Sequence, residues 1–195
     1  MVARRSSGTL LKVRRKRGLG PTQRYHGQVA TYQIRLFGDP VLTQAAKEVT
    51  DVDGRLVALA EAMVETMHEA NGLGLAAPQV GVQKRMFVYQ MGDDADPVTI
   101  INPTISDFRG EWEYDEGCLS IPGLFFPIVR PKEIHLTGYD LHGREVSIEA
   151  DELEARCFQH ELDHLDGRLL IGLLDKDQKK QAMKELRRRS QLEEA

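Results

Sequence analysis

The stretch HELDH at residues 160–164 has the pattern HExxH, and it lies in a segment, residues 151–165, whose spacing is helical. Residues four apart share one face of a helix, so both imidazoles can bind the same ion. Glu161 stands beside the first histidine, where its carboxylate can hold and deprotonate a water bound to that ion. The sequence therefore predicts a central helix that carries a metal site.

A third protein ligand has to come from elsewhere, because HExxH alone also occurs by chance. The metzincin pattern HExxHxxGxxH fits at Gly167 but fails at Leu170, where its last histidine belongs. Cys118, in the small-residue turn at residues 115–120 that could present its thiolate freely, is a better ligand than a downstream carboxylate or the other histidines. One thiolate and two imidazoles with an open fourth position are typical of a catalytic metal site. The histidines set aside are His26, His68, His135 and His142.

Taken alone, a third segment, GLGLAAPQ at residues 72–79, reads as a closely packed Gly/Ala-rich loop after a helix, but beside the other two motifs it completes the site. Its glycines allow the backbone to approach a ligand closely. Gln79 at its end offers an amide donor suited to an oxyanion.

The segments GLGLAAPQ, EGCLS and HELDH, in that order, resemble the peptide deformylase family from about residue 32 to residue 172. The segment GLFFP at residues 123–127 and the basic N-terminal arm resemble the subset found in high-GC Gram-positive bacteria. The resemblance implies a metal-dependent hydrolase that removes the N-terminal formyl group from formyl-methionyl nascent polypeptides. A water activated by the metal and by Glu161 would attack the formyl carbon, and formate would be released.

The resemblance also implies the metal ligands and the cofactor. Cys118, His160 and His164 would bind one divalent ion, and Glu161 would act as general base and then as general acid. Fe(II) is the usual metal of the family, with zinc, nickel or cobalt as alternatives. The donor atoms do not choose among them, because nitrogen and sulfur also suit zinc.

The same resemblance implies a set of substrate contacts. Gln79 and the backbone N–H of Leu119 would stabilise the oxyanion. Gly72 and Gly74 would lie against the substrate, and Cys157 would line the pocket for the methionine side chain.

Four further positions bear on the neighbourhood of the site. Glu116 and Arg130 match family positions that pair and brace the Cys118 loop. Arg156 and Phe125 fall where family members vary, and some members carry a peptide-contacting arginine near Phe125. We therefore expect the peptide contacts to differ here.

The rest of the chain predicts an α+β fold, with short antiparallel β-sheets surrounding the central HExxH helix, plus a C-terminal helix. A first helix is expected over residues 54–70, capped by Asp53 or Thr50, and a last one from Asp175 to Arg189. Alternating or β-branched runs predict the strands. These runs cover residues 85–90, 98–102, 128–140 and 144–150.

Charge divides the chain unevenly. Residues 1–38 hold nine of the 26 Lys and Arg residues and no acidic residue, so the remainder has 17 basic and 30 acidic residues, a net of −13. We expect residues 1–30 to form a disordered basic arm, residues 31–175 the catalytic domain, and residues 176–195 a basic C-terminal helix of the same domain. The arm has two alternative roles, binding RNA phosphates or organellar targeting.

Location and partners follow from what the sequence lacks. It has no run of 18 apolar residues, no secretory signal and only two cysteines, which predicts a cytoplasmic protein without membrane or DNA partners. The resemblance implies transient ribosome contact, for which residues 1–30 and 176–189 supply the basic charge.

Two other functions remain to be distinguished. A metalloprotease would share the HExxH helix but would need another downstream ligand. A non-catalytic metal-binding module on the ribosome would have no use for Glu161 as a base.

Overall fold

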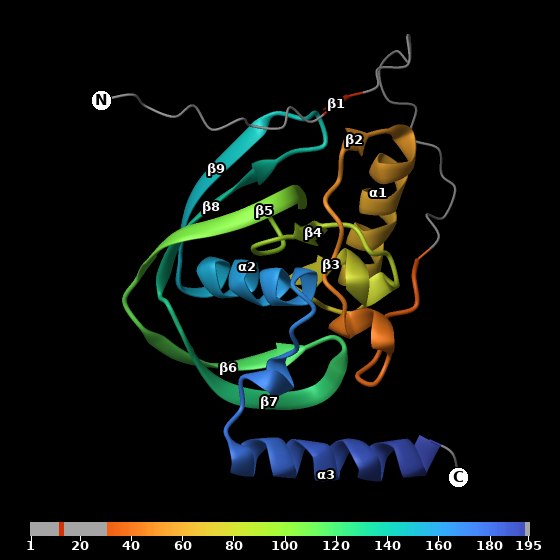
Figure 1. The fold of residues 1–195 in the computed structure, drawn as a ribbon, viewed down its shortest axis with the longest axis vertical. Coiled ribbons are helices and arrows are strands. Elements are labelled where there is room, and N and C mark those ends of the chain that lie inside the picture. Colours follow the sequence, from red (N-terminus) through yellow and green to blue (C-terminus); the bar gives the residue numbers. More distant parts are fainter. Residues whose placement is uncertain (1–11, 14–30, 194–195) are drawn as a thin grey trace.

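The centre of the computed structural model, which describes residues 12–13 and 31–193, is a five-stranded antiparallel sheet in the order β3-β4-β5-β8-β9 (Figure 1). The strands are β3 (Gly74–Ala76), β4 (Met86–Tyr89), β5 (Val98–Arg109), β8 (Glu133–Tyr139) and β9 (Glu145–Asp151). A separate antiparallel ribbon is formed by β6 (Trp112–Cys118) and β7 (Ile121–Arg130). The short strands β1 (Lys12–Val13) and β2 (Asp51–Val52) pair in parallel.

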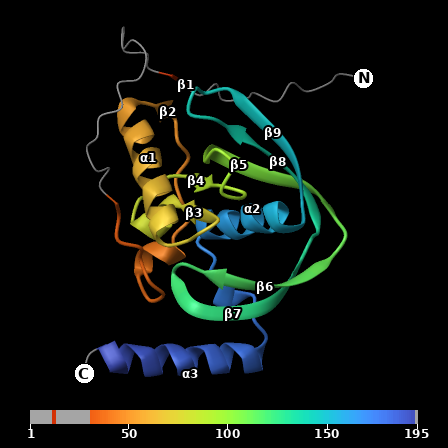
Figure 2. The same cartoon turned by 180° about the vertical axis from the view of Figure 1, so that it is seen from behind.

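In the described part of the chain, three helices complete the fold: α1 (Gly54–Glu69), α2 (Glu152–Leu165) and α3 (Lys176–Glu193). Three short 3-10 turns are η1 (Pro40–Thr43), η2 (Ala77–Val80) and η3 (Leu170–Gly172). Both views show α2, which carries HExxH, between the large sheet and the β6–β7 ribbon (Figures 1 and 2). The predicted α+β class, with antiparallel sheets around the motif helix and a helix at the C-terminal end, is confirmed.

Strand β4 is buried on both faces, which explains its unbroken apolar sequence MFVY. Met86 and Val88 belong to the core under α1, while Phe87 and Tyr89 belong to the core under α2. Successive side chains of a strand point to opposite faces, so one strand joins the two cores. This arrangement fixes α1 and α2 on opposite sides of the sheet.

Helix α1 begins where the sequence predicts. The Asp53 carboxylate accepts hydrogen bonds from the backbone N–H groups of Arg55 (3.0 Å) and Leu56 (2.9 Å), so it is the N-cap. The helix ends before Asn71, whose φ of 53° lies in the left-handed region. The chain then enters β3, which delivers the glycine-rich segment to the middle of the molecule.

Helix α3 packs on the β6–β7 ribbon through a third core. Ala182 is buried against a cluster that includes Ile121 and Ile128 of β7. Arg189 donates from Nη1 to the carbonyl of Pro122 (2.6 Å), which ties the far end of the helix to the same ribbon. Asp175 accepts from the N–H groups of the first turn, as predicted for the N-cap.

Three local expectations were wrong or lie outside the described part. The run 128–140 is two strands, because the chain leaves the ribbon at Arg130 and joins the sheet at Glu133. The segment 72–79 is not a loop, since residues 74–76 pair with β4 and the next four form η2. The expected disordered arm, residues 1–30, lies outside the described residues apart from β1. Within the described chain, no helix is long and apolar enough to cross a membrane.

The core under α2 should depend strongly on Phe158, which is fully buried and lies edge-on to Tyr89 with ring centroids 4.7 Å apart. Phe158→Ala should lower the free energy of unfolding by about 3–5 kcal/mol, because the cavity is lined by rigid sheet residues. Phe108→Ala is the matched control, since Phe108 is 57% exposed, and it should change stability by less than about 0.5 kcal/mol. Chemical denaturation measures both. Equal losses would contradict this description of the core.

Candidate active site

Three donor side chains meet where the ribbon crosses α2. Cys118 ends β6, and His160 and His164 lie one helical turn apart on α2. One donor atom from each lies within 4.8 Å of the other two, and Cys118 Sγ is 3.2 Å from His164 Nε2. The structure therefore brings together the predicted ligand set. Cys118 is held at the end of a paired strand and not in a free turn.

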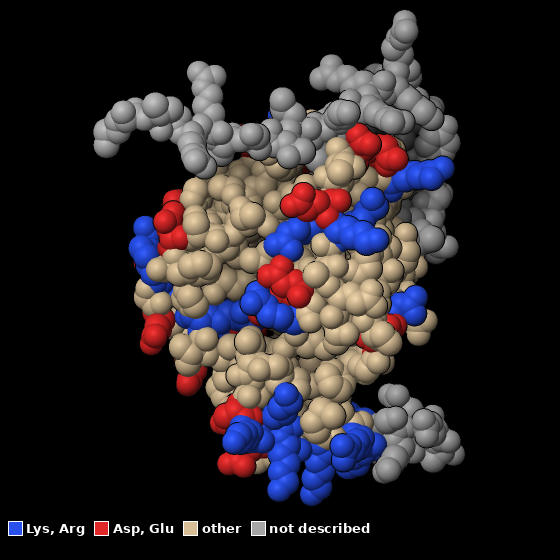
Figure 3. All heavy atoms as spheres, viewed as in Figure 1, with Lys and Arg blue, Asp and Glu red and all other residues tan. Residues whose placement is uncertain are grey.

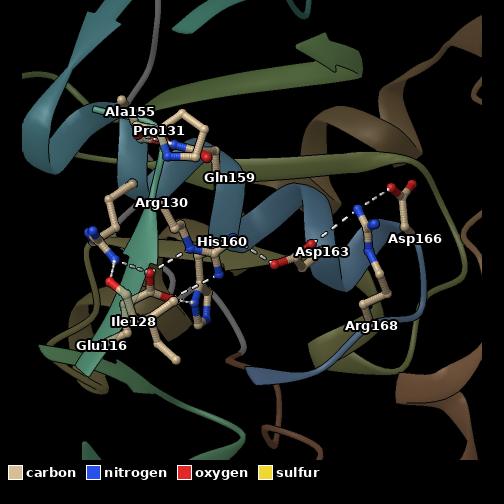
Figure 4. A network of polar contacts seen from close by, with 11 residues as sticks. Glu116, Ile128, Arg130, Pro131, Ala155, Gln159, His160, Asp163, Asp166 and Arg168 are labelled. Carbon is tan, nitrogen blue, oxygen red and sulfur yellow. Dashed lines mark hydrogen bonds and ion pairs between the residues drawn. The ribbon is translucent and has the colours of Figure 1, made fainter. Parts of the chain in front are cut away.

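Glu116 orients the first histidine. His160 donates from Nδ1 to Glu116 Oε2 at 3.1 Å, which leaves its Nε2 for the ligand group (Figure 4). Arg130 donates to both Glu116 oxygens, at 2.6 and 3.0 Å. Burial alone would raise the pKa of Glu116, but the hydrogen bonds from His160 and Arg130 outweigh it and lower this pKa to about 2.

The same network continues towards the surface. Arg130 also donates to Asp163 at 2.8 Å, and Arg168 pairs with Asp163 (3.1 Å) and with Asp166 (2.9 Å). Figure 4 shows Asp163 between the two arginines. Arginine and carboxylate side chains alternate along this row of ion pairs, so each buried charge in it has a partner of opposite sign.

The electrostatics favour a thiolate at Cys118. Burial opposes its ionisation, but the imidazoles of His164 and His160 outweigh this and hold its pKa well below the ordinary value. In the same way, burial would lower the pKa of His160, and Cys118 and Glu116 raise it well above the ordinary value. A thiolate is the form of cysteine that binds metal.

Glu161 is a buried carboxyl beside these ligands. Burial raises its pKa to about 7, against the opposing influence of His160 and His164. Its Oε2 has no hydrogen-bond partner among the described residues. A Cβ added to Gly74 would lie 2.5 Å from Glu161 Oε1 and 2.8 Å from Cys157 Sγ. Only glycine therefore fits at this point of β3.

Gln79 is oriented by its own backbone neighbourhood. Its Oε1 accepts from the N–H of Ala76 at 2.8 Å, which directs Nε2 towards Ser120 Oγ (3.3 Å) and Cys118 Sγ (3.9 Å). The amide donor is thus fixed beside the ligand group. Leu119 follows Cys118 directly and lines the same cleft.

A cleft of about 580 Å³ opens onto this group. Cys118, His160 and Glu161 lie in its wall, and Cys157 is almost completely buried beside them. The outer wall is apolar and includes Phe125, which is 68% exposed. The segments 72–74 and 122–125 line the two sides.

The residues present fit a divalent metal ion. A thiolate and two imidazoles converge, one imidazole is oriented by Glu116, and the free oxygen of Glu161 lies next to them. Such a set leaves one coordination position for water, as catalytic sites require. Both cysteines are free thiols, so no disulfide competes for Cys118.

Comparison with known proteins agrees with this geometry. The family model for polypeptide deformylase matches residues 31–180. The peptide deformylase of Acidothermus cellulolyticus is 47% identical over 161 residues, which cover 82% of this chain and 87% of the relative. The chain belongs to the peptide deformylase family. It is accordingly an enzyme of the metallo-hydrolase type.

Other family members extend the comparison. The peptide deformylase of a Parafrankia species is also 47% identical, over 156 residues that cover 79% of this chain and 84% of the relative. Both relatives come from high-GC bacteria, in agreement with the predicted subset. The crystal structure of the Legionella pneumophila deformylase superposes with a TM-score of 0.80 at 36% identity, covering 84% of this chain and 98% of that one. The Ehrlichia chaffeensis deformylase in complex with actinonin gives a TM-score of 0.78 at 38% identity, covering 82% and 98%.

The sequence indicated Arg156 as a position near the site but did not indicate its role. Arg156 is buried, lines the cleft and donates to Glu116. Its signal was weak, because an arginine on a helix usually faces solvent. The deformylase resemblance marked the position only as variable.

Gly74→Ala should cost roughly 10²-fold or more in deformylase activity, because the new methyl group displaces the Glu161 carboxylate by a large fraction of an ångström. Gly172→Ala is the control, since nothing lies within 4 Å of its Cβ position, and it should keep full activity. Steady-state kinetics of the two variants make the comparison. Normal activity in Gly74→Ala would contradict the close approach of β3 to Glu161.

Proposed function

We propose that this chain removes the N-terminal formyl group from formyl-methionyl polypeptides, with Glu161 as general base and general acid. The observation that carries the proposal is the meeting of Glu161 with the Cys118, His160 and His164 donors at the wall of one cleft. Membership of the deformylase family supports it. The assigned roles of individual residues are part of the proposal.

Cys118, His160 and His164 would hold the ion. When bound there, a divalent ion would lower the pKa of a water molecule and polarise the formyl oxygen. Glu161 takes the proton of the attacking water and later gives it to the leaving amine. Its burial suits this exchange, because a carboxyl with a pKa near neutrality can both accept and donate a proton.

Two donors of this chain face the developing negative charge on the formyl oxygen. Gln79 Nε2 is held in place by its bond to the Ala76 N–H, so it needs no reorganisation during the reaction. The Leu119 N–H is the second donor. Gly72 and Gly74 let the substrate backbone approach, and Cys157 forms part of the methionine pocket.

The substrate test compares formyl-Met and acetyl-Met tripeptides. The wild-type protein should release formate and leave the acetyl peptide intact. Glu161→Gln preserves the shape of the side chain but removes the base, and it should lose at least about 10²–10⁴ in rate. Cleavage of unformylated peptides would indicate a protease, and a normal rate in Glu161→Gln would contradict the proposed mechanism.

The oxyanion role of Gln79 has its own test. Gln79→Ala should lower kcat by roughly 10²–10³-fold, with a smaller effect on KM, because the donor acts mainly in the transition state. Steady-state kinetics on the formyl-Met tripeptide measure both. A change confined to KM would show that Gln79 binds the ground state instead.

Iron(II) is the proposed native metal, on the basis of the family resemblance, while zinc, nickel and cobalt remain compatible with the donors. Protein purified without oxygen should contain iron and should lose activity on exposure to air. Loading the metal-free protein with each ion in turn and measuring its activity ranks the four metals. Zinc in the native protein, with full activity, would contradict the choice of iron.

Transient ribosome contact, and with it a cytoplasmic location, is also part of the proposal. Six basic residues of α3 are exposed, and Figure 3 shows blue side chains gathered over this end of the molecule. They are Lys176, Lys179, Lys180, Lys184, Arg187 and Arg188. The apolar side of α3 packs on the ribbon, so we infer that residues 176–195 belong to the catalytic domain and present a fixed basic surface.

Replacing Lys179, Lys180 and Lys184 by Gln should weaken co-sedimentation with ribosomes, because fewer phosphates are neutralised. Formate release from a tripeptide should stay unchanged in this variant. Undiminished ribosome binding would exclude this face of α3. The contribution of the basic arm, residues 1–30, is then measured by its deletion in the same assay.

A further inference from the structure

Arg156 is a buried cation in the wall of the cleft. Its side chain is 4% exposed, and it lies four residues before His160, on the same face of α2. Burying a guanidinium is costly unless it is paired and hydrogen-bonded. Its partners therefore indicate what it does.

Those partners all belong to the β6–β7 ribbon. Arg156 Nη1 donates to Glu116 Oε1 at 2.5 Å and to the Ile128 carbonyl at 3.0 Å, and Nη2 donates to the Trp112 carbonyl. The guanidinium also lies 4.9 Å from the centre of the Trp112 ring. One side chain thus connects α2 to both strands that frame Cys118.

The two oxygens of Glu116 have different partners. Oε1 accepts from Arg130 Nε and from Arg156 Nη1, while Oε2 accepts from Arg130 Nη2 and from His160 Nδ1. Arg130 also donates to Asp163, so its guanidinium is bonded to two carboxylates. Arg156 has no second carboxylate partner among the described residues, so its hold on Glu116 is undivided.

We propose that Arg156 is a positioning residue of the metal site, which acts through Glu116 to fix the ring of His160. The proposal rests on the ligand roles given above. With Arg156 in place, Glu116 keeps one oxygen on His160 Nδ1, and the ring presents Nε2 to the ion. Without it, Glu116 can turn towards Arg130 alone, and the orientation of the ring is lost.

The test measures release of Zn²⁺ from loaded protein into an excess of chromogenic chelator. Arg156→Met removes every donor but keeps a long side chain, and it should release Zn²⁺ about 10–100-fold faster than wild type. Arg168→Met is the matched control: it removes the same charge from the same network, but Arg168 contacts Asp163 and Asp166 and not Glu116. It should release Zn²⁺ at the wild-type rate.

A double-mutant cycle separates positioning from general packing. If Arg156 acts through Glu116, adding Arg156→Met to Glu116→Ala should not accelerate release further. An additive effect, or wild-type retention of Zn²⁺ in Arg156→Met, would overturn the proposal. Far-UV circular dichroism reports whether each variant is folded, because the fluorescence of Trp112 would respond directly to the loss of the Arg156 side chain beside it.

If Arg156→Met does not fold, Arg156→Lys decides in its place, because lysine keeps the charge but lacks the planar fork that reaches Glu116 and Trp112 together. This variant should still fold and should release Zn²⁺ several-fold faster than wild type, and unchanged release would overturn the proposal. Wild-type protein that binds no Zn²⁺ at all would instead contradict the metal site on which the proposal rests. The two failures are therefore distinguishable.

Discussion

The arrangement of the site depends on one buried carboxylate, that of Glu116. It stands two residues before Cys118 on β6, so both side chains point to the same face of the ribbon, towards α2. Burying this charge is tolerable only because Arg130, Arg156 and His160 all bond to it. The same bonds bring a cysteine from a strand and two histidines from a helix to one place. A satisfied buried charge thus sets the register between ribbon and helix.

The remaining parts of the fold stabilise this contact between the β6–β7 ribbon and α2. Strand β4 is packed between two helical layers, which makes the sheet a rigid base for α2. Strand β3 joins its edge and places Gly74 against Glu161. Helix α3 packs on the same ribbon through a cluster that includes Ile121 and Ile128 of β7, and this contact holds the ribbon in place. Chemistry of this kind needs donors held on rigid elements, and each donor here lies on one or beside one.

Local patterns in the sequence predicted much of the architecture. The helical spacing of residues 54–70, the Asp53 cap and the HExxH helix depend on neighbours within a few positions, and all three are found. The break between β7 and β8 was missed, because residues 128–140 form one β-type run without a glycine turn. Which sheet each half joins is decided by distant partners. The segment 72–79 was read as a loop for the same reason, since its pairing with β4 is tertiary.

Within the site, residue type and spacing indicated the cluster of Cys118, His160 and His164, and the family resemblance indicated the Glu116–Arg130 pair, but neither indicated the contact between Arg156 and Glu116. The role of Arg156 depends on the contact of α2 with residues about 40 positions away in the chain, and the local sequence pattern does not report such contacts. X-ray absorption at the metal edge of anaerobically purified protein would test directly whether Cys118 of the ribbon and the two histidines of α2 bind the same ion. We expect one sulfur and two imidazole nitrogens around the ion, with the sulfur lost in Cys118→Ser. A metal shell without sulfur in the wild-type protein would contradict the junction of ribbon and helix described here.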